Sequence, residues 1–566
     1  MTSASQSKLG IAEFLSSQSW IWTHHCSWSS RVARLQRPME FRRVYLRVLR
    51  NCCRGHPDAF LGVNAAVLTG YFLVLLNGGA YLPMVPRIIA SFGRNIVYGV
   101  WTQDLYFFAV ASAFLVAPWM RQHYDARKAL LFCYAIFFLA SALNSWTQNY
   151  TVFLAARIVS GLAGGLSIPL SLPLLLRGYR QRTRHYALLI WGLLAVTPFV
   201  LGPFLGGWID DRWGWRWLFL LDLPILLFCF LGILLWQRPV AKVEKRQMDW
   251  WSSALLSSAL LFWEMALNLG SKDDWWRSSS IRALAIAGVI IFFVWILRKI
   301  PNRSGALQNF PSIQQSNAGV AALGLLVSAV VFQGLMALFI IHYQLSFQYS
   351  ARAVGEIFLS MAVPAFFSVV LGHCLRGRID PRFWVGISMS LLAVSAFWLS
   401  SYNLPTTPQS LDQPLALAGL ALGGSFAGWT RIGAWGLSAT PAEGMMRMLS
   451  SLQALGQAMG IPIIIGLWGR RLSLHRHFLV EVQGSNLQAW SRQLSLLSNR
   501  LGSLGAEKIF AARVHEQAAM LAFNEMFFLA GWVFLALAFL GLLARRPQPS
   551  GESQAETMTA VGLAEP

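Results

Sequence analysis

The sequence predicts an all-α membrane protein that crosses the bilayer about fourteen times. Of its 566 residues, 55% are hydrophobic and only 12% are charged, whereas a soluble domain carries about 25% charged residues. The mean hydropathy is +0.50. Apolar runs of about 20 residues, the length of a helix that spans the hydrocarbon core, recur along the whole chain. These observations exclude a soluble enzyme with a single membrane anchor.

The apolar runs begin after the first 58 residues and are separated by polar segments. Each is close to the length that crosses roughly 30 Å of hydrocarbon. They lie near residues 60–83, 98–120, 129–146, 151–176, 187–209, 215–236, 250–270, 281–298, 317–345, 353–375, 383–402, 414–438, 449–469 and 520–544. Because their number is even, both termini are expected on the same side of the membrane.

The distribution of positive charge predicts which side that is. Segments after even-numbered runs are basic, as in RQHYDARK and RGYRQRTRHY, whereas those after odd-numbered runs, such as DDRWG, are short and mixed. Basic loops stay in the cytoplasm, so both termini are predicted to be cytoplasmic. The net charge of +22 resides largely in these short blocks, and a nucleic-acid partner is therefore not expected.

One long segment, residues 470–519, is the exception, because it is basic yet placed outside. Long loops translocate largely regardless of charge. Apolar residues near helical spacing predict an amphipathic helix within it, at Leu487, Trp490, Leu494, Leu497 and Leu501. The segment is interpreted either as a surface for a partner or as a packed external cap.

The first 58 residues are polar and basic. An unordered cytoplasmic tail is preferred there over a helix with a basic face on the membrane surface. Met39 is an alternative start residue. The six cysteines form no spacing that predicts a disulfide framework or a metal site: Cys26, Cys52, Cys53, Cys133, Cys229 and Cys374.

Polar and charged residues within the apolar runs are the candidate functional residues, because burying them in hydrocarbon is costly. Five stand out: Asn77, Asp104, Arg157, Asp222 and Glu264. Counting along each helix from the membrane side at which it starts places all five in the outer half of the bilayer. Their common depth indicates a shared site.

A buried arginine stays charged and needs a carboxylate or carbonyl nearby, and an acid beside it can alternate between protonated and paired forms. Asp104, Arg157 and Asp222 therefore form the minimum set for proton-linked transport. The alternative for each acid is a place at the membrane interface, where it would contact water or helix ends. No metal or organic cofactor is expected, and the sequence contains no phosphate-binding GxxxxGK[ST] motif. Energy is thus expected from an ion gradient or a partner.

Small residues predict close helix packing in several runs. Gly202, Pro203, Gly206 and Gly207 lie in the fifth run, where a kink is expected beside a small-residue face. Other clusters are GLAGG at 161–165, GLALGGSFAG at 419–428 and GQAMG at 456–460. The main interpretation of these clusters is helix packing, with mobility of the packed helices as a consequence.

These motifs resemble the fourteen-helix drug:proton antiporters of the EmrB/QacA type, within the major facilitator superfamily, from about residue 60 to 545. LGPFLGG is similar to the fifth-helix antiporter motif, and FLAARIVSGLAGG places Arg157 at the position linked to proton coupling. WRWLFLLDLP resembles a segment that usually has Asn where this chain has Asp222. LFWEMALNLGSKDDWW resembles the inserted-helix segment, with Glu264 where Gln is common. FIIHYQLSFQYSARAVG, SSLQALGQAMGIPIIIG and EQAAMLAFNEMF resemble runs 9, 13 and 14.

Two departures from the family pattern bear on mechanism. In LVLLNGGAYLPMVP, Asn77 occupies the position of a membrane-embedded Asp, and an amide cannot carry a proton. In PWMRQHYDARK, Pro118 and Gln122 replace the Gly and Asp of a loop motif, and only Arg127 and Lys128 persist. The hypothesis is that Asp104 or Asp222 takes over coupling beside Arg157.

The resemblance implies a major facilitator fold, with two six-helix bundles around a cavity and an inserted helix pair. The predicted division is a basic extension at 1–58, bundles at 59–238 and 317–546, an inserted pair with linker at 239–316 and a cytoplasmic tail at 547–566. Asn77, Glu264 and Gln344 are the candidate cavity residues.

The implied function is proton-coupled efflux of amphipathic drugs or toxic organic compounds by alternating access, without enzymatic activity. The predicted partners are protons, the lipid bilayer and, for a Gram-negative source, a periplasmic adaptor with an outer-membrane channel. Two alternatives stay open. One is a proton-independent facilitator or importer of a small metabolite, and the other is a membrane interaction protein that does not transport.

Overall fold

The structure is a computed structural model that describes residues 57–180, 183–237, 250–270, 277–299, 316–375, 378–403, 407–435, 437, 439–485 and 503–545. The basic extension up to residue 56, the tail from 546 and the predicted amphipathic helix at 487–501 lie outside the described residues. Residues 271–276, the last part of the segment LFWEMALNLGSKDDWW, also lie outside the described residues. The regular elements of the described part are α-helices and short 3-10 helices.

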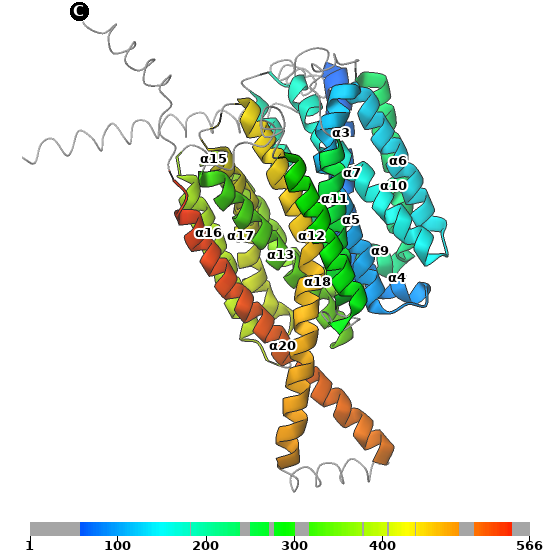
Figure 1. Ribbon diagram of the computed structural model, residues 1–566, viewed down its shortest axis with the longest axis vertical. Coiled ribbons are helices and arrows are strands. Elements are labelled where there is room, and N and C mark those ends of the chain that lie inside the picture. Colours follow the sequence, from blue (N-terminus) through cyan, green and yellow to red (C-terminus); the bar gives the residue numbers. More distant parts are fainter. Residues whose placement is uncertain are drawn as a thin grey trace, which may run out of the picture.

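The first half of the chain forms helices that lie side by side (Figure 1). They are α3 (Pro57–Gly79), η1 (Leu82–Met84), α4 (Val85–Ser91), α5 (Ile96–His123), α6 (Ala126–Trp146), α7 (Tyr150–Gly178), α8 (Arg184–Val200), α9 (Gly202–Trp213) and α10 (Arg216–Trp236).

The remaining helices follow in chain order, beginning with a pair that lies at the front of Figure 1. They are α11 (Trp250–Gly270), α12 (Ser279–Lys299), α13 (Ser316–Leu345), α14 (Ala351–Ile357), η4 (Phe358–Met361), α15 (Ala362–Cys374), α16 (Pro381–Ser400), η5 (Pro408–Leu411), α17 (Asp412–Ala434), α18 (Ala439–Ser485) and α20 (Ser503–Leu542).

The prediction of about fourteen spans is confirmed in the described part of the chain. Twelve helices are long and apolar enough to cross a membrane, and the bent pair α8–α9 makes a thirteenth. The one remaining predicted run, near residues 414–438, corresponds to α17, with 23 residues. Its glycine-rich face packs against α15 and α16, so α17 needs less apolar surface than a helix that faces lipid.

Local sequence signals account for the helix ends and for the bend. The side chains of Asp125 and Asn149 accept hydrogen bonds from backbone amides at the starts of α6 and α7, as N-cap residues do. Between α8 and α9 the axis bends by 50°. Pro203 lies at this break, in the first turn of α9, where its missing N–H removes a bond of the helical ladder. The expected kink is therefore present.

Helices from the early part of the chain pack against helices from the late part. Helix α5 packs against α18, and α9 packs against α14, so early and late parts of the chain share two seams. Helix α11 lies over the first of these seams, in contact with both α5 and α18.

Two helices extend past the bundle at one end (Figure 1). Helix α18 has 47 residues and α20 has 40, about twice the roughly 20 that span the hydrocarbon core. The segment expected to be a loop from residue 470 is therefore helical up to Ser485 and again from Ser503. Arg471 and His475 of α18 both contact Glu525 of α20, at 3.0 Å, and hold the bases of the two arms together.

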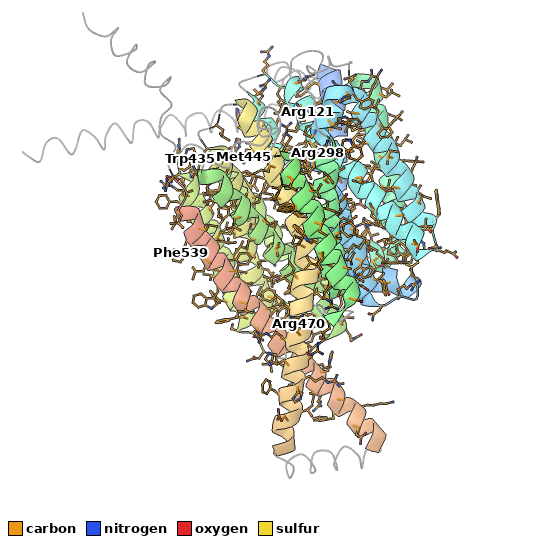
Figure 2. All side chains as sticks on the ribbon, viewed as in Figure 1. Arg121, Arg298, Trp435, Met445, Arg470 and Phe539 are labelled. Atoms are coloured by element: carbon orange, nitrogen blue, oxygen red, sulfur yellow. The ribbon has the colours of Figure 1, made fainter. Side chains whose placement is uncertain are left out.

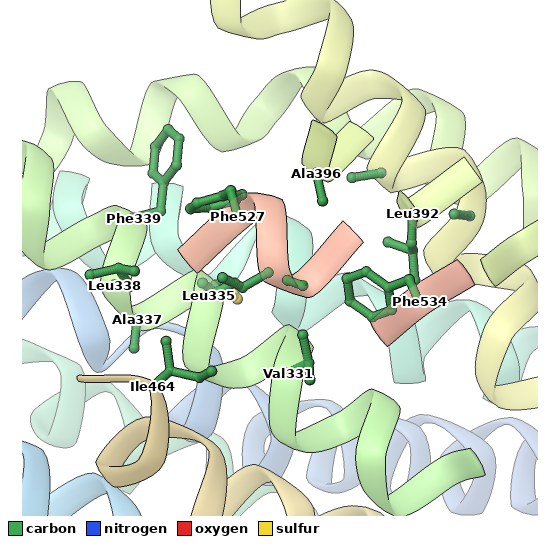
Figure 3. Packing of buried hydrophobic residues seen from close by; sticks show 14 of the residues in the cluster. Val331, Leu335, Ala337, Leu338, Phe339, Leu392, Ala396, Ile464, Phe527 and Phe534 are labelled. Atoms are coloured by element: carbon green, nitrogen blue, oxygen red, sulfur yellow. The ribbon is translucent and has the colours of Figure 1, made fainter. Parts of the chain in front are cut away.

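Apolar side chains fill the bundle and also cover its outside. Figure 3 shows Val331, Leu335 and Phe339 of α13 among Phe527 and Phe534 of α20. A cavity of about 50 Å³ lies between these helices, well below the roughly 300 Å³ of a small-molecule site. Outward-facing apolar residues such as Phe539, 62% exposed (Figure 2), are those expected of a surface in contact with lipid.

Candidate functional site

Asn77 and Asp222, both about 1% exposed, form a hydrogen-bonded pair between α3 and α10. The side-chain amide of Asn77 donates to both carboxylate oxygens of Asp222, at 3.0 and 3.1 Å. Ser141 of α6 donates to the same carboxylate at 2.8 Å. The acid is thus held by two side chains from neighbouring helices. The resemblance places an acid at 77 and an amide at 222, so the two functional groups are exchanged in this chain.

Arg157 is fully buried and lies between two tyrosine rings. Its guanidinium carbon is 4.3 Å from the ring centres of both Tyr81 and Tyr106, an arrangement that stabilises a desolvated cation. One guanidinium nitrogen donates to Gln103 at 2.8 Å. Within the described residues, no carboxylate lies within ion-pair distance of Arg157, although the charge on Asp222 does act on it.

Gln103 connects the arginine to the helix that carries Asn77. Its side-chain amide donates to the backbone oxygen of Gly78 at 2.5 Å while its oxygen accepts from Arg157. Tyr106 donates to the backbone oxygen of Val74, also on α3, at 2.6 Å. The arginine on α7 and the acid on α10 are therefore linked through α3. A shift of α3 would change the surroundings of both groups.

Asp104 lies apart from this network, although it follows Gln103 in sequence. Its side chain is fully buried and interacts with Glu264 and Asn268 of α11. Asn268 donates to Glu264 at 3.1 Å. Of the two acids predicted to accompany Arg157, the structure brings only Asp222 close to its network. Glu264, a candidate cavity residue, faces α5.

Gln344, the third candidate cavity residue, lies in a contact between the early and late helices. At the end of α13, its side-chain amide donates to the backbone oxygen of Pro83 in η1, at 2.7 Å. Its own side-chain oxygen is buried without a partner. The amide therefore helps to hold α13 against η1 at the end of the bundle from which the arms extend.

The small residues of the antiporter motif also make contacts at this end. A Cβ at Gly206 would collide with the backbone oxygen of Ala80, and one at Gly202 would lie 2.7 Å from the carbonyl carbon of Gly79. Both therefore allow α9 to approach the end of α3. A Cβ at Gly207 would collide with the backbone oxygen of Ala351 in α14.

Pro203 takes part in the same approach of α9 to α14. A Cβ at Gly355 of α14 would lie 2.5 Å from the backbone oxygen of Pro203. The motif thus brings α9 against α3 on one side and α14 on the other. The clusters at 161–165, 419–428 and 456–460 make similar close contacts with neighbouring helices, which confirms the prediction that they serve helix packing.

The altered loop motif makes contacts within the first half of the chain. Asp125 accepts a hydrogen bond from the backbone amide of Arg127 at 3.3 Å and caps α6. The Arg127 side chain donates to the backbone oxygen of Leu234 in α10, at 2.5 Å. The Arg127 side chain thus joins α6 to α10, while Asp125 caps the start of α6.

Sequence reasoning missed three residues that surround the arginine: Tyr81, Gln103 and Tyr106. The run Thr102-Gln103-Asp104 is a signal for Gln103, because three consecutive polar residues within an apolar helix are unusual. The tyrosines carry no such signal, since aromatic residues are common in membrane helices. Thr102 also pairs with the Tyr81 hydroxyl, which holds that ring beside Arg157.

Comparison with known proteins agrees with this architecture. The family model "Major Facilitator Superfamily" matches residues 67–461. The multidrug export protein EmrB of Escherichia coli strain K12 is 24% identical over 495 residues, covering 86% of this chain and 96% of that protein. The fatty acid resistance protein FarB of Neisseria gonorrhoeae is 24% identical over 507 residues, covering 87% and 97%.

Solved structures share the fold at low sequence identity. The crystal structure of a bacterial homologue of the human lysosomal transporter Spinster, inward-facing and unoccupied, superposes with a TM-score of 0.57 at 12% identity, covering 88% of this chain and 100% of that one. The human organic anion transporter MFSD10 gives a TM-score of 0.51 at 16% identity, with 84% and 99% covered. The match to the family model covers more than half of the chain, and the EmrB-type resemblance predicted from the motifs is confirmed. The chain therefore belongs to the Major Facilitator Superfamily.

Proposed function

We propose that this protein is a secondary active transporter that exports amphipathic organic compounds in exchange for protons. Relatives named for multidrug export and fatty acid resistance match it over most of their length, which supports this substrate class. The described helices supply many apolar and aromatic side chains and few buried charges. Transport proceeds by alternating access, in which the two helical halves rock about a site near the middle of the membrane.

The observation that carries the proton-coupling proposal is the contact between Asn77 and Asp222. An acid at 222 lies beside the position where the resemblance expects an acid at 77. Compared with the family pattern, the proton-binding carboxylate is on the neighbouring helix α10 instead of α3. It still lies in the same region of the protein. Asp222 binds and releases the proton, and Arg157 provides a fixed positive charge whose influence on Asp222 changes as the helices move.

The same contact argues against a proton-independent facilitator. That alternative followed from the amide at Asn77, which cannot titrate. With Asp222 accepting hydrogen bonds from Asn77, a titratable group is available at this place. The non-transporting alternative followed from the altered loop motif. Arg127 of that motif joins α6 to α10 and Asp125 caps α6. The motif therefore has a structural role in a protein that transports.

Transport by purified protein in proteoliposomes tests the proposal. A deletion strain is first screened against toxic organic compounds, and a fluorescent compound to which it is hypersensitive serves as the probe. We expect an imposed proton gradient to drive the probe against its concentration gradient. The Asp222→Asn variant should lose this proton-driven transport. Equal transport with and without the proton gradient in the wild type would contradict proton coupling.

We further propose that the arms formed by α18 and α20 project to the periplasmic side of a bacterial inner membrane, with both termini cytoplasmic. They would dock an adaptor that leads to an outer-membrane channel. Leu474, Phe478 and Val480 of α18 and Ile509 of α20 are exposed on the arms, beyond the length needed to span the bilayer. Leu474 and Phe478 are four residues apart and so share one face of α18, and a contiguous exposed apolar patch is typical of a surface that binds another protein.

A further inference from the structure

A second pair of buried acids lies outside the site described above, between α5 and α11. Asp104 is fully buried and Glu264 is 1% exposed. Asn268, one helical turn after Glu264, donates its side-chain amide to the Glu264 carboxylate at 3.1 Å and interacts with Asp104. Trp101 of α5 donates to the backbone oxygen of Asn268 at 3.3 Å. The two acids and the amide thus form one polar cluster between two helices.

This cluster contains more hydrogen-bond acceptors than donors. Both oxygens of Asp104, one oxygen of Glu264 and the side-chain oxygen of Asn268 are buried without a hydrogen-bond partner. Asn268 is itself only 5% exposed. Two ionised carboxylates and an amide oxygen cannot donate to one another. A hydrogen bound to one of the acids would supply the missing donor.

The neighbouring helices supply no positive charge in place of that hydrogen. Arg157 of α7 is engaged by Gln103 and two tyrosine rings. On α4, Arg87 pairs with Asp210 and Asp211. Within the described residues, no cation lies within ion-pair distance of Asp104 or Glu264.

The other helices packed on the cluster are equally poor in charge. Helix α18 carries no titratable side chain between Arg447 and Arg470, and Arg282 of α12 is exposed. On α5 itself, the neighbouring ionisable side chains are the phenols of Tyr98 and Tyr106, which supply no positive charge. Two adjacent buried carboxylates cannot both ionise without such compensation.

We propose that Asp104 and Glu264 retain one proton between them and form a second proton-binding site, separate from Asp222. In the protonated state, one acid donates a hydrogen bond within the cluster and the other accepts. Asn268 holds the geometry by donating to Glu264. Loss of the proton leaves two carboxylates that repel each other across the contact between α5 and α11.

The site lies beside a contact between early and late helices, which must change when the two halves of the protein move. Helix α11 contacts both α5 and α18, and so covers a seam between early and late helices. Leu260 and Leu261 of α11 pack against the apolar cluster that Tyr106 of α5 and Ala454 of α18 share. Deprotonation would loosen α11 from α5, at the place where the two halves must move. The inserted helix is thus assigned a part in proton binding.

Infrared difference spectroscopy of the purified full-length protein in lipid nanodiscs tests this inference without a transport substrate. The carbonyl stretch of a protonated carboxylic acid is separate from the bands of carboxylates. On a shift from neutral to alkaline pH, we expect the wild type to lose a carboxylic-acid band. In Asp104→Asn and Glu264→Gln the band should shift in frequency, and in the double variant this component should be absent.

Asp222→Asn is the matched control, because it removes a different buried acid and should leave the component assigned to Asp104 and Glu264 unchanged. A double variant with the full wild-type difference spectrum would overturn the inference. So would a wild-type band that appears only when sodium ions are omitted, since the cluster would then bind sodium. The two outcomes do not depend on whether the protein exports drugs.

Labelling of the wild-type protein covers the case in which the double variant does not fold. Dicyclohexylcarbodiimide reacts with protonated carboxyl groups in apolar surroundings, and peptide mass spectrometry locates the adduct. We expect an adduct on Asp104 or Glu264 at neutral pH that decreases at alkaline pH. Labelling of Asp222 with none on either residue of the pair would overturn the inference.

Discussion

Asn77 of α3 and Asp222 of α10 are joined by an amide that reaches both carboxylate oxygens, at 3.0 and 3.1 Å. Neither residue is exposed to solvent, and Ser141 completes the surroundings of the acid. Because the pair is a contact between two helices, the amide and the acid occupy complementary positions. Their exchange relative to the family pattern can therefore be tested by exchanging them back.

The first prediction concerns that exchange. Asn77→Asp combined with Asp222→Asn restores the family arrangement, and we expect proton-driven transport to persist within about tenfold of wild type. Asp222→Asn alone leaves no acid in the pair and should abolish coupling. Probe accumulation in proteoliposomes under a proton gradient measures both. If the exchanged variant is folded yet as inactive as the single variant, the two positions are not interchangeable.

The second prediction concerns Arg157. Replacement by lysine retains the charge but loses the planar group that lies between Tyr81 and Tyr106 and donates to Gln103. We expect a loss of roughly 1.5–3 kcal/mol in stability, because the buried oxygen of Gln103 loses its charged hydrogen-bond donor, together with a strong loss of coupled transport. Thermal unfolding and proteoliposome transport measure the two effects. Arg282→Lys, at an exposed position on α12, is the matched control and should change neither.

The third prediction concerns the contact of α9 with α14. Gly207→Ala places a methyl group against the backbone of Ala351, and overpacking of this kind costs about 1–3 kcal/mol. We expect the population of molecules in which α9 packs against α14 to fall by on the order of tenfold, and transport to slow accordingly. Cross-linking of cysteines introduced in α9 and α14 reports the closed contact. Gly192→Ala, where the nearest atom is Val369 at 3.6 Å, should leave the cross-linking yield unchanged.

The fourth prediction concerns the arms. Phe478→Ser removes an apolar side chain that is 56% exposed and contacts water in the isolated protein. We expect lower drug resistance of cells that express the variant, with unchanged transport in proteoliposomes, because the proposed adaptor takes part only in export from cells. Arg476→Ser, two residues away on the same arm, is the control. Equal loss in cells and in proteoliposomes would indicate a role within the transporter itself.

Much of the fold was predictable, because the length of an apolar run reports directly on whether its helix can span the membrane. The fourteen runs correspond to the helices in order, and the kink at Pro203 follows from its chemistry. The positions at which helices end were less predictable. Helix α18 continues from the membrane to Ser485 without a break, since polarity alone does not end a helix when no proline or glycine turn follows.

The candidate site was predictable in composition but not in pairing. A common depth grouped Asp104, Arg157, Asp222 and Glu264, yet depth does not say which way a side chain points. In a helix that is apolar on all sides, the pattern of residues gives no direction to the buried face. Only the packing of α5 against α7 and α11 separates Gln103, which faces Arg157, from Asp104, which faces Glu264.

The pairing of Asn77 with Asp222 also constrains how such a transporter can evolve. Single substitutions that exchange the two residues must pass through a protein with two adjacent acids or with two amides. The first intermediate places like charges together in the membrane, and the second carries no proton at this place. The two positions are therefore expected to change together among descendants, and a lineage that has crossed between the two arrangements should seldom return.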